Sequence, residues 1–456
     1  MKRALVRGRT RLARGGSVMV LAAALAGAVA TPLAGQAAGP SAPVAASGQE
    51  PTVTLDQAIE LALRHNPTMT QRVGAVRTSE SAERTSLGAF LPSLSLSSGA
   101  SLSSSDRFDA NTQTTVRGSN ESFSAGLSTS MDVFTGGRRG AQLQVSRANT
   151  AAAEASLVEQ RFAVALQAKQ AYFNVLRGEE TVRISQARVE RGEQGLRAAE
   201  VRLSAGSATR SDSLRAQLEL TQARQALLQA QHQRRSAAYV LGALVGVRGP
   251  VAAEPLASLD PAPLAMSEEQ LRQLALESSP AVISSESSMR ASEASLQASR
   301  AQYLPTLRAS GGYDWSNQDA AFNGGRTSWS TRLSLSYPLF NNFSREDANE
   351  RAEVNLSNAR VVLADAQRQA LAQVQQAIDA VNLAGEQIAL TQEAQRVAAE
   401  DLRVQETRYG LSATTILELI TSQIALVEAE LNQINARYDY QVALAELEAL
   451  IGRELR

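Results

Sequence analysis

A proline-free stretch of about 67 residues, from Gly137 to about Leu203, most constrains how this chain folds. It is rich in Ala, Gln, Glu, Arg and Leu, a composition that favours continuous helix. At about 1.5 Å per residue the helix would be roughly 100 Å long, far beyond an ordinary globular helix. In its distal half apolar residues recur at every seventh position, at Val175, Val182, Val189, Leu196 and Leu203. This spacing is typical of a coiled-coil-like contact, so the sequence predicts a long helical hairpin or a helical barrel.

The first forty residues have the features of a secretory signal peptide. Six basic residues precede an apolar run from about Val18 to Ala30, and small residues follow. Cleavage is expected after Ala30 or Ala37, so residues 1–37 are assigned to the signal peptide and 38–51 to a flexible leader. The chain has no cysteine, which excludes disulfides, thiolate metal sites and a lipid-modified N-terminal cysteine.

Charge and composition exclude several classes of function. Basic and acidic residues balance at 45 each, and removal of the signal peptide leaves the mature chain mildly acidic with no basic block, which argues against a nucleic-acid partner. His65 and His232 are the two histidines, too few for a metal cluster, and they are interpreted as surface or packed residues. No apolar stretch is long enough for a transmembrane helix. We expect no catalytic, cofactor-binding or metal-binding residues and therefore no enzyme.

The chain is a tandem duplication. Thr54-x-x-Gln57, Asn66-Pro67 and Leu91-Pro92 reappear as Ser267-x-x-Gln270, Ser279-Pro280 and Leu304-Pro305, each displaced by 213 positions. Later pairs are displaced by 206 positions, namely Phe134 and Phe340, Arg202 and Arg408, Thr209 and Thr415, and Gln217 and Gln423. Such matches predict a repeated unit. The copies are assigned to 52–246 and 267–452, with a Pro- and Gly-containing linker at 247–266 and a tail at 453–456.

Each copy is predicted to run as helix, β-hairpin, long helix and helix. The hairpin strands are inferred from apolar residues that alternate with Ser, Gly and charged residues, a period of two. They are expected at about 91–104, 121–134, 304–316 and 327–340, and the first hairpin is expected to have a long polar loop. The second long helix is expected from about Phe343 to Arg408, with sevenfold spacing at Leu383, Leu390, Val397, Val404 and Leu411.

Four amphipathic strands of about ten residues have the length and pattern of outer-membrane barrel strands. Tyr313, Trp315, Trp329 and Tyr337 are expected at the membrane interfaces. Four strands cannot close a barrel, and an open edge in lipid leaves backbone groups unpaired, so the chain is expected to oligomerise. The alternative is a soluble sheet packed on a helical layer, but the helices are several times longer than such a sheet could cover.

From about residue 52 to 452 the chain resembles the TolC-like outer-membrane efflux and secretion ducts, also called outer membrane factors. The resemblance lies in the Asn66-Pro67 break, Leu-Pro before each first strand, Ala171-Tyr172-Phe173-Asn174 in the long helix, and the two helix tips around residues 202–214 and 408–420. It implies a mainly α fold with membrane β-structure, assembled as a homotrimer with a twelve-stranded β-barrel in the outer membrane and a twelve-helix α-barrel in the periplasm. It also implies an equatorial region formed by the linker and tail.

The resemblance further implies a passive exit duct of a tripartite efflux pump or type I secretion system. Its partners would be outer-membrane lipid, a periplasmic adaptor protein and an inner-membrane transporter, and no cofactor is implied. Two alternatives remain, a periplasmic adaptor and a coiled-coil scaffold without a membrane barrel. An adaptor would need compact β domains beside one hairpin, and a scaffold would be recovered in the soluble periplasmic fraction.

The helix tips are the candidate gate. Thr209-x-x-Asp212 and Thr415-x-x-Glu418 resemble helix capping boxes, which need no role beyond starting a helix. The family resemblance implies more: Asp212 and Tyr409 would link neighbouring hairpins and hold the aperture shut, and Glu418 would form an acidic ring by threefold symmetry. The chain departs from the family at Ser412, where Gly is usual, and at Thr414 and Thr421, where a well-studied relative has a basic and an acidic residue.

A run of charged residues precedes the first tip, at Arg188, Glu190, Arg191, Glu193, Arg197, Glu200 and Arg202. It is interpreted as solvated helix surface with pairs such as Glu193 and Arg197, or alternatively as a contact surface for the adaptor.

Overall fold

The computed structural model describes residues 50–109, 113–256, 266–319, 321, 323–453 and 455, and the chain from Glu50 onward forms one unit. The expected signal peptide, most of the leader, residues 257–265 of the linker and two residues of the tail lie outside the described residues. Within the described parts, no helix is long and apolar enough to cross a membrane.

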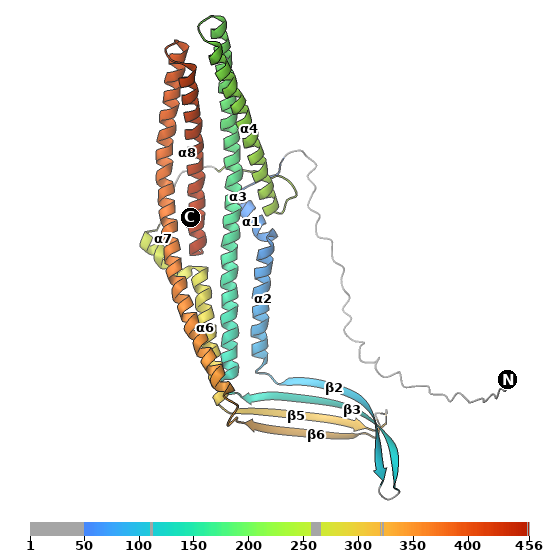
Figure 1. The fold of residues 1–456 in the computed structure, drawn as a ribbon. Helices are drawn as coiled ribbons and strands as arrows, with labels where there is room; N and C mark the ends of the chain where they lie inside the picture. The colour runs from blue at the N-terminus through green and yellow to red at the C-terminus, as the bar shows by residue number, and fades with distance from the viewer. Residues whose placement is uncertain are drawn as a thin grey trace, which may run out of the picture. The chain divides into compact units, whose positions relative to one another are not determined.

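Both copies have the expected order of elements (Figure 1). The first consists of α1 (Leu55–His65), α2 (Pro67–Gly88), β2 (Ser93–Asp109), β3 (Thr114–Phe134), α3 (Arg138–Ser204) and α4 (Arg210–Leu244). The second consists of α5 (Glu268–Ser278), α6 (Pro280–Arg300), the 3₁₀ turn η1 (Ala301–Tyr303), β5 (Thr306–Asn317), β6 (Arg326–Ser336), α7 (Ser344–Gly410) and α8 (Ile416–Ile451). The long helices α3 and α7 are 67 residues each, as the proline-free stretches predict.

Local sequence signals determine where the short helices begin and break. Thr54 and Ser267 form complete capping boxes with Gln57 and Gln270, because each side chain bonds the other residue's backbone N–H. Pro67 and Pro280 occupy the first turn of α2 and α6, where a missing N–H costs nothing. The helix therefore restarts at each proline.

The four long strands form one antiparallel sheet in the order β2-β3-β5-β6, so the pairing of β3 with β5 joins the two copies. The first hairpin differs from expectation: its ladder runs from Ser93 paired with Ser130 to Asp109 paired with Thr114. The expected long polar loop is therefore mostly strand, because backbone pairing continues where the alternation of apolar side chains stops. In the second hairpin β6 ends at Ser336 rather than near 340, since Pro338 has no N–H to continue the ladder.

A two-stranded parallel pair lies away from this sheet. β1 (Thr52–Val53) pairs with β4 (Ala252–Ala253), so the start of the expected first repeat lies against the expected linker. Val53, Val251 and Ala253 are buried there with Tyr172 and Leu241. Tyr172 donates a hydrogen bond of 2.5 Å to the carbonyl oxygen of Glu254, which fixes the linker on α3.

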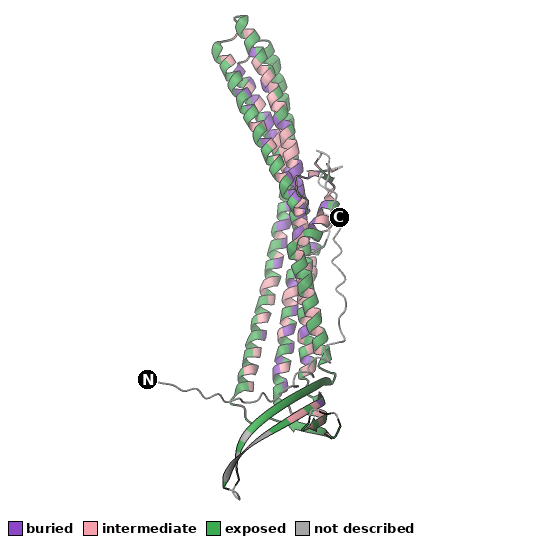
Figure 2. Ribbon diagram, turned by 90° about the vertical axis from the view of Figure 1, so that its right-hand side faces the viewer, coloured by how far each residue is buried: buried purple, intermediate pink, exposed green. Residues whose placement is uncertain are grey.

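The helices form a layer and two hairpins. α2, α3, α6 and α7 run side by side from the sheet, and α3 with α4 and α7 with α8 continue beyond them as antiparallel hairpins (Figure 1). Buried residues concentrate along the helices, whereas the strands are largely exposed (Figure 2). One core cluster lies on α3, α4, α1 and α8, a second on α5, α7 and α8, and a third near the second tip on α7 and α8 alone.

Candidate functional site

One face of the sheet is apolar and exposed. The strand registers place Leu96, Leu127, Tyr313 and Trp329 in a single row across all four strands. These four side chains are exposed, Trp329 by 78%. Leu94, Leu102, Leu333 and Leu335 lie exposed on the same face at other positions along the strands. A contiguous apolar face of this extent marks a contact with lipid or another protein.

The expected interface aromatics lie at two levels on this face. Tyr313 pairs directly with Trp329, and Trp315 lies two residues farther from the helices. Tyr337 follows the last residue of β6, at the end of the sheet next to the helices. About eight strand positions separate the two levels, which corresponds to about 26 Å at the usual rise. Along a strand tilted by about 40° it spans about 20 Å of height, most of the roughly 25 Å apolar band of a membrane barrel.

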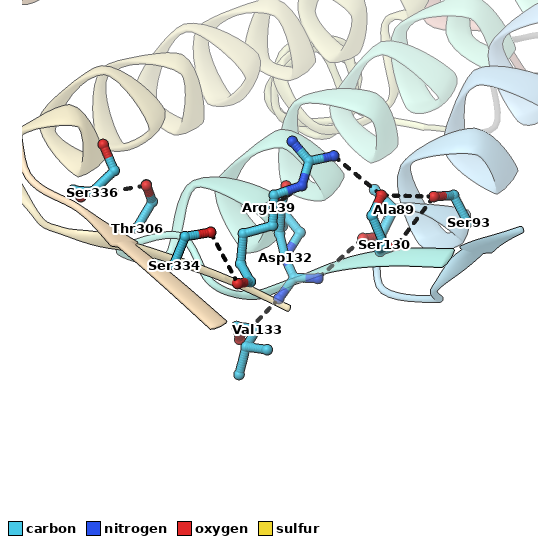
Figure 3. Close-up of polar contacts among 10 residues, drawn as sticks. Ala89, Ser93, Ser130, Asp132, Val133, Arg139, Thr306, Ser334 and Ser336 are labelled. Carbon is cyan, nitrogen blue, oxygen red and sulfur yellow. Dashed lines mark hydrogen bonds and ion pairs between the residues drawn. The ribbon is translucent and has the colours of Figure 1, made fainter. Parts of the chain in front are cut away.

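The opposite face of the sheet is polar. Its serines bond across β2 and β3, with oxygen separations of 2.9 Å for Ser93 and Ser130 and 2.7 Å for Ser95 and Ser128. Near the helices Arg308 donates to the Ser130 hydroxyl at 3.1 Å and lies 3.6 Å from the Asp132 carboxylate (Figure 3). The serines thus satisfy one another, and charged groups occupy the end of this face nearest the helices.

Arginine clamps join the strands to the helices. Arg139 donates to the carbonyl oxygens of Ala89 at 3.0 Å and Val133 at 3.2 Å, so it ties the end of α2 to the end of β3 (Figure 3). Its guanidinium carbon lies 4.9 Å from the centre of the Phe90 ring. Sequence analysis did not identify this residue.

The second copy repeats the clamp. Arg345 donates to the carbonyl oxygens of Pro338 and Leu339 and lies 4.9 Å from the centre of the Tyr303 ring. Arg345 is Arg139 displaced by 206 positions, and Tyr303 is Phe90 displaced by 213. The repeat offsets are therefore the sequence signal that would have found both clamps.

A hollow of about 660 Å³ lies on a face shared by α2, α3, α6 and α7. Its lining residues are small or polar, and include Ser86, Gln142, Ser295, Ser299 and Arg351. Asp132, from the polar face of the sheet, lines it too. The polar face of the sheet therefore meets a face of the helical layer that small and polar residues line.

At the first tip, Thr209 and Asp212 form a complete capping box. The Asp212 carboxylate accepts hydrogen bonds from the Thr209 N–H at 2.9 Å and hydroxyl at 2.8 Å, and Thr209 Oγ1 accepts from the Asp212 N–H. These bonds from Thr209 hold the pKa of Asp212 below its usual value. The observed role of Asp212 within the protomer is to start α4.

At the second tip the cap is partial. Thr415 Oγ1 accepts from the Glu418 N–H at 3.4 Å, but the Glu418 carboxylate accepts from the Thr414 hydroxyl at 2.9 Å instead of reaching back to the cap. The Glu418 side chain is exposed, so it remains available to surroundings outside the protomer.

Tyr409 is only 8% exposed and packs with Leu402, Ile416 and Leu419 inside the second hairpin. Its contact with the first hairpin is Arg202, whose guanidinium carbon lies 4.4 Å from the centre of the Tyr409 ring. Among the described residues of one protomer, Asp212 and Tyr409 share no hydrogen bond. The predicted link between Asp212 and Tyr409 would therefore have to form between neighbouring protomers.

Several charges before the first tip join α3 to α4. Arg188 binds the buried Glu219 of α4 at 2.8 Å, and Glu193 binds Arg224 of α4 at 3.0 Å. The expected pair of Glu193 with Arg197 is therefore wrong, because the longer reach across the hairpin to Arg224 is available. The histidines are structural or exposed: His65 Nδ1 lies 2.9 Å from the Leu61 carbonyl oxygen, and His232 lies on the surface of α4. Within the described ranges no three metal-ligating side chains gather.

Comparisons with family models and with curated proteins point to the same family. The family model described as outer membrane efflux protein matches residues 58–247 and 271–453. The pyoverdine export outer membrane protein OpmQ of Pseudomonas aeruginosa is 26% identical over 410 residues, which cover 87% of this chain and 83% of the relative.

Several solved structures have a similar fold, among them CusC and VceC. The structure of CusC aligns with a TM-score of 0.77 at 20% identity, covering 88% of this chain and 92% of that one. The outer membrane protein VceC from Vibrio cholerae aligns with a TM-score of 0.74 at 19% identity, covering 88% and 97%.

Proposed function

Since this chain belongs to the outer membrane efflux protein family and therefore resides in the outer membrane, we propose that it is the passive exit duct of a tripartite efflux pump or a type I secretion system. Substrate would enter at the helix tips in the periplasm and leave through the barrel. The driving energy would come from an inner-membrane transporter, coupled through a periplasmic adaptor.

The observation that carries this proposal is the two-faced sheet and its continuation. One face offers lipid an apolar band with aromatic residues at two levels, and the other is polar and meets the hollow of the helical layer, which small and polar residues line. A continuous hydrophilic wall behind a lipid-facing surface is what a water-filled duct requires.

Assembly as a homotrimer would complete the duct. Four strands leave two open edges in lipid, whereas three copies would supply twelve strands and close the barrel. The apolar residues at every seventh position along α7 and its C-terminal cap, here called the seam of α7, support the same conclusion. All five are exposed in the protomer: Leu383, Leu390, Val397, Val404 and Leu411. The seam would be buried against a neighbouring copy.

We assign the gate to the helix tips that carry Asp212, Tyr409 and Glu418, with Glu418 contributing an acidic ring. Thr209 and Thr415 would hold the first turns of α4 and α8 in place beside them. A periplasmic adaptor or coiled-coil scaffold would have no use for the exposed apolar face of the sheet, and the family match disfavours both.

Reconstitution tests the proposal with matched variants on the two faces of β6. The detergent-extracted protein should run as a trimer of the 48.4 kDa chain less its signal peptide and should form pores in planar bilayers. Leu333→Arg, on the apolar face, should abolish insertion, because a central arginine facing lipid costs about 2–4 kcal/mol. Ser330→Arg, on the polar face, should insert and change only the conductance. A monomer without conductance would overturn the proposal.

A further inference from the structure

The two hairpins of one protomer are joined differently along their length. Near the middle of α3 the join is apolar, with Phe173 packed against Tyr438 of α8 at a centroid distance of 6.0 Å. At the same level Arg177 binds Asp439 at 2.6 Å, and towards the tips Arg191 lies 3.9 Å from Glu430. The core cluster near the second tip contains no residue of α3 or α4. The hairpins therefore share little apolar surface near the tips.

The contact of Arg191 with Glu430 is a poor one. Both side chains are largely buried, and the facing Arg191 Nη2 and Glu430 Oε2 lack hydrogen bonds within the described protomer. A buried charge pair without hydrogen bonds gains little against its desolvation. Closure of the hairpins below the tip therefore needs support from another contact.

Arg202 provides that contact. Its Nη1 donates to the Tyr409 carbonyl oxygen at 2.5 Å, and its Nη2 donates to the Ser412 hydroxyl. The guanidinium also lies on the Tyr409 ring. One side chain of the first hairpin thus makes three contacts with the turn of the second, using the planar fork that lysine lacks.

Ser412 has a backbone conformation that serine rarely adopts. Its φ is +58°, in the left-handed region that favours glycine. The residue displaced by 206 positions in the first tip is Gly206, at φ +76°. Serine is therefore strained in a backbone conformation that glycine adopts freely. In return, its hydroxyl accepts a hydrogen bond from Arg202.

The two copies differ in the residues that could bind this arginine. Tyr409 corresponds to Leu203 in the first copy, as Ser412 corresponds to Gly206. Arg408, which corresponds to Arg202, donates to Ala413 within its own turn. The arginine is thus present in both tips, but its stacking and hydroxyl partners are present only in the second.

We propose that Arg202, through Tyr409 and Ser412, is the latch that holds the second hairpin against the first in the closed duct. The inference rests on the proposed function, since it assigns a residue to the closing of that gate. Opening requires Arg202 to release the turn of the second hairpin, after which the apolar join at Phe173 and Tyr438 acts as the pivot.

Conductance of the reconstituted protein tests the latch. Arg202→Leu should raise the fraction of time open by about tenfold, the factor that corresponds to a lost charge-assisted bond. Ser412→Gly should raise it less, without lowering thermal stability, because it relieves strain while removing the hydroxyl. The double variant should open no more than Arg202→Leu alone. Arg403→Leu is the control, since Arg403 pairs with Glu400 on its own helix and should leave conductance unchanged.

A second measurement does not depend on a pore. The chain has no cysteine, so spin labels at Ser207→Cys and Ala413→Cys, diluted with unlabelled chains, report the distance between the two tips of a protomer. Arg202→Leu should lengthen and broaden that distance, and Arg403→Leu should not. An unchanged distance overturns the latch whatever the conductance. A changed distance in a protein that forms no pore overturns the duct and leaves the contact between hairpins standing.

Discussion

The ring of Phe173 on α3 packs on the ring of Tyr438 on α8, with centroids 6.0 Å apart and planes inclined at 38°. Each residue comes from a different copy of the duplicated unit. Tyr438 belongs to the core cluster formed mostly by the first copy, together with Val175 and Leu176. The two copies therefore share a core at this level.

Burial raises the pKa of Tyr438 to about 12, and the carboxylates of Glu180 and Glu179 add to the shift. Since the folded pKa exceeds the unfolded value, this contribution to stability is complete below about pH 10 and is lost as pH rises through about 12. Tyr438→Phe should therefore flatten the alkaline fall in thermal unfolding temperature. Tyr239→Phe, at an exposed site, is the control, and equal alkaline curves for wild type and Tyr438→Phe would contradict the assignment.

Lys169 on α3 binds the buried carboxylate of Glu448 on α8 at 2.6 Å, and Glu448 also accepts from the N–H of Leu455 at 3.2 Å. Glu448→Ala should destabilise the protein by about 3–5 kcal/mol, because it leaves a lysine charge largely buried without its partner. The double variant Lys169→Met with Glu448→Leu should lose less. Denaturant unfolding measures both. Glu393→Ala, in an exposed pair with Arg396, should have no measurable effect.

The tyrosine at the second tip can be tested in two steps. The latch uses the ring and the backbone of Tyr409, so Tyr409→Phe should keep the duct closed and Tyr409→Ala should open it. Single-channel recording distinguishes the two. If Tyr409→Phe alone opens the duct, the hydroxyl is the essential group, and a bond to Asp212 of a neighbouring protomer becomes the explanation, as the family resemblance implies.

The exposed seam of α7 predicts a subunit contact. Leu390, 71% exposed in the protomer, is the second of the five seam residues, and Leu390→Glu should dissociate the trimer because it places a charge in an apolar contact. Gln392→Glu adds the same charge at an exposed position outside the seam and should leave the trimer intact. Light scattering in detergent measures the mass, and a Leu390→Glu trimer would contradict the seam's role.

Much of the fold can be predicted from repeats, capping residues and prolines in the sequence. The displacements of 213 and 206 reveal the duplication, capping boxes start α1 and α5, and prolines break the short helices where expected. Strand ends were less visible, because pairing between β2 and β3 extends past the last alternating residue at either end of the loop. Alternation in the sequence reveals where one face of a strand is apolar. Backbone hydrogen bonding between the strands continues where that alternation has ended.

The candidate site was less predictable for a related reason. The sequence indicates that Thr209 and Asp212 cap a helix, which needs only three residues of separation. Arg202 meets Ser412 across 210 positions, and no local pattern encodes that contact. The seam of α7 was visible in the sequence, but only the structure shows that α8 packs on a different face, around Val374, Val381 and Ile388, and leaves the seam exposed.

The two tips of one protomer are not equivalent, because Ser412 occupies the position of Gly206 in the first copy. Three copies of a duplicated chain place six hairpins around an axis, and their backbones approximate a sixfold arrangement. The latch distinguishes alternate hairpins, because only the second copy has a tyrosine and a serine for the arginine to bind. The aperture would therefore dilate by the outward movement of every other hairpin, and its open shape would be a three-lobed opening rather than a widening circle.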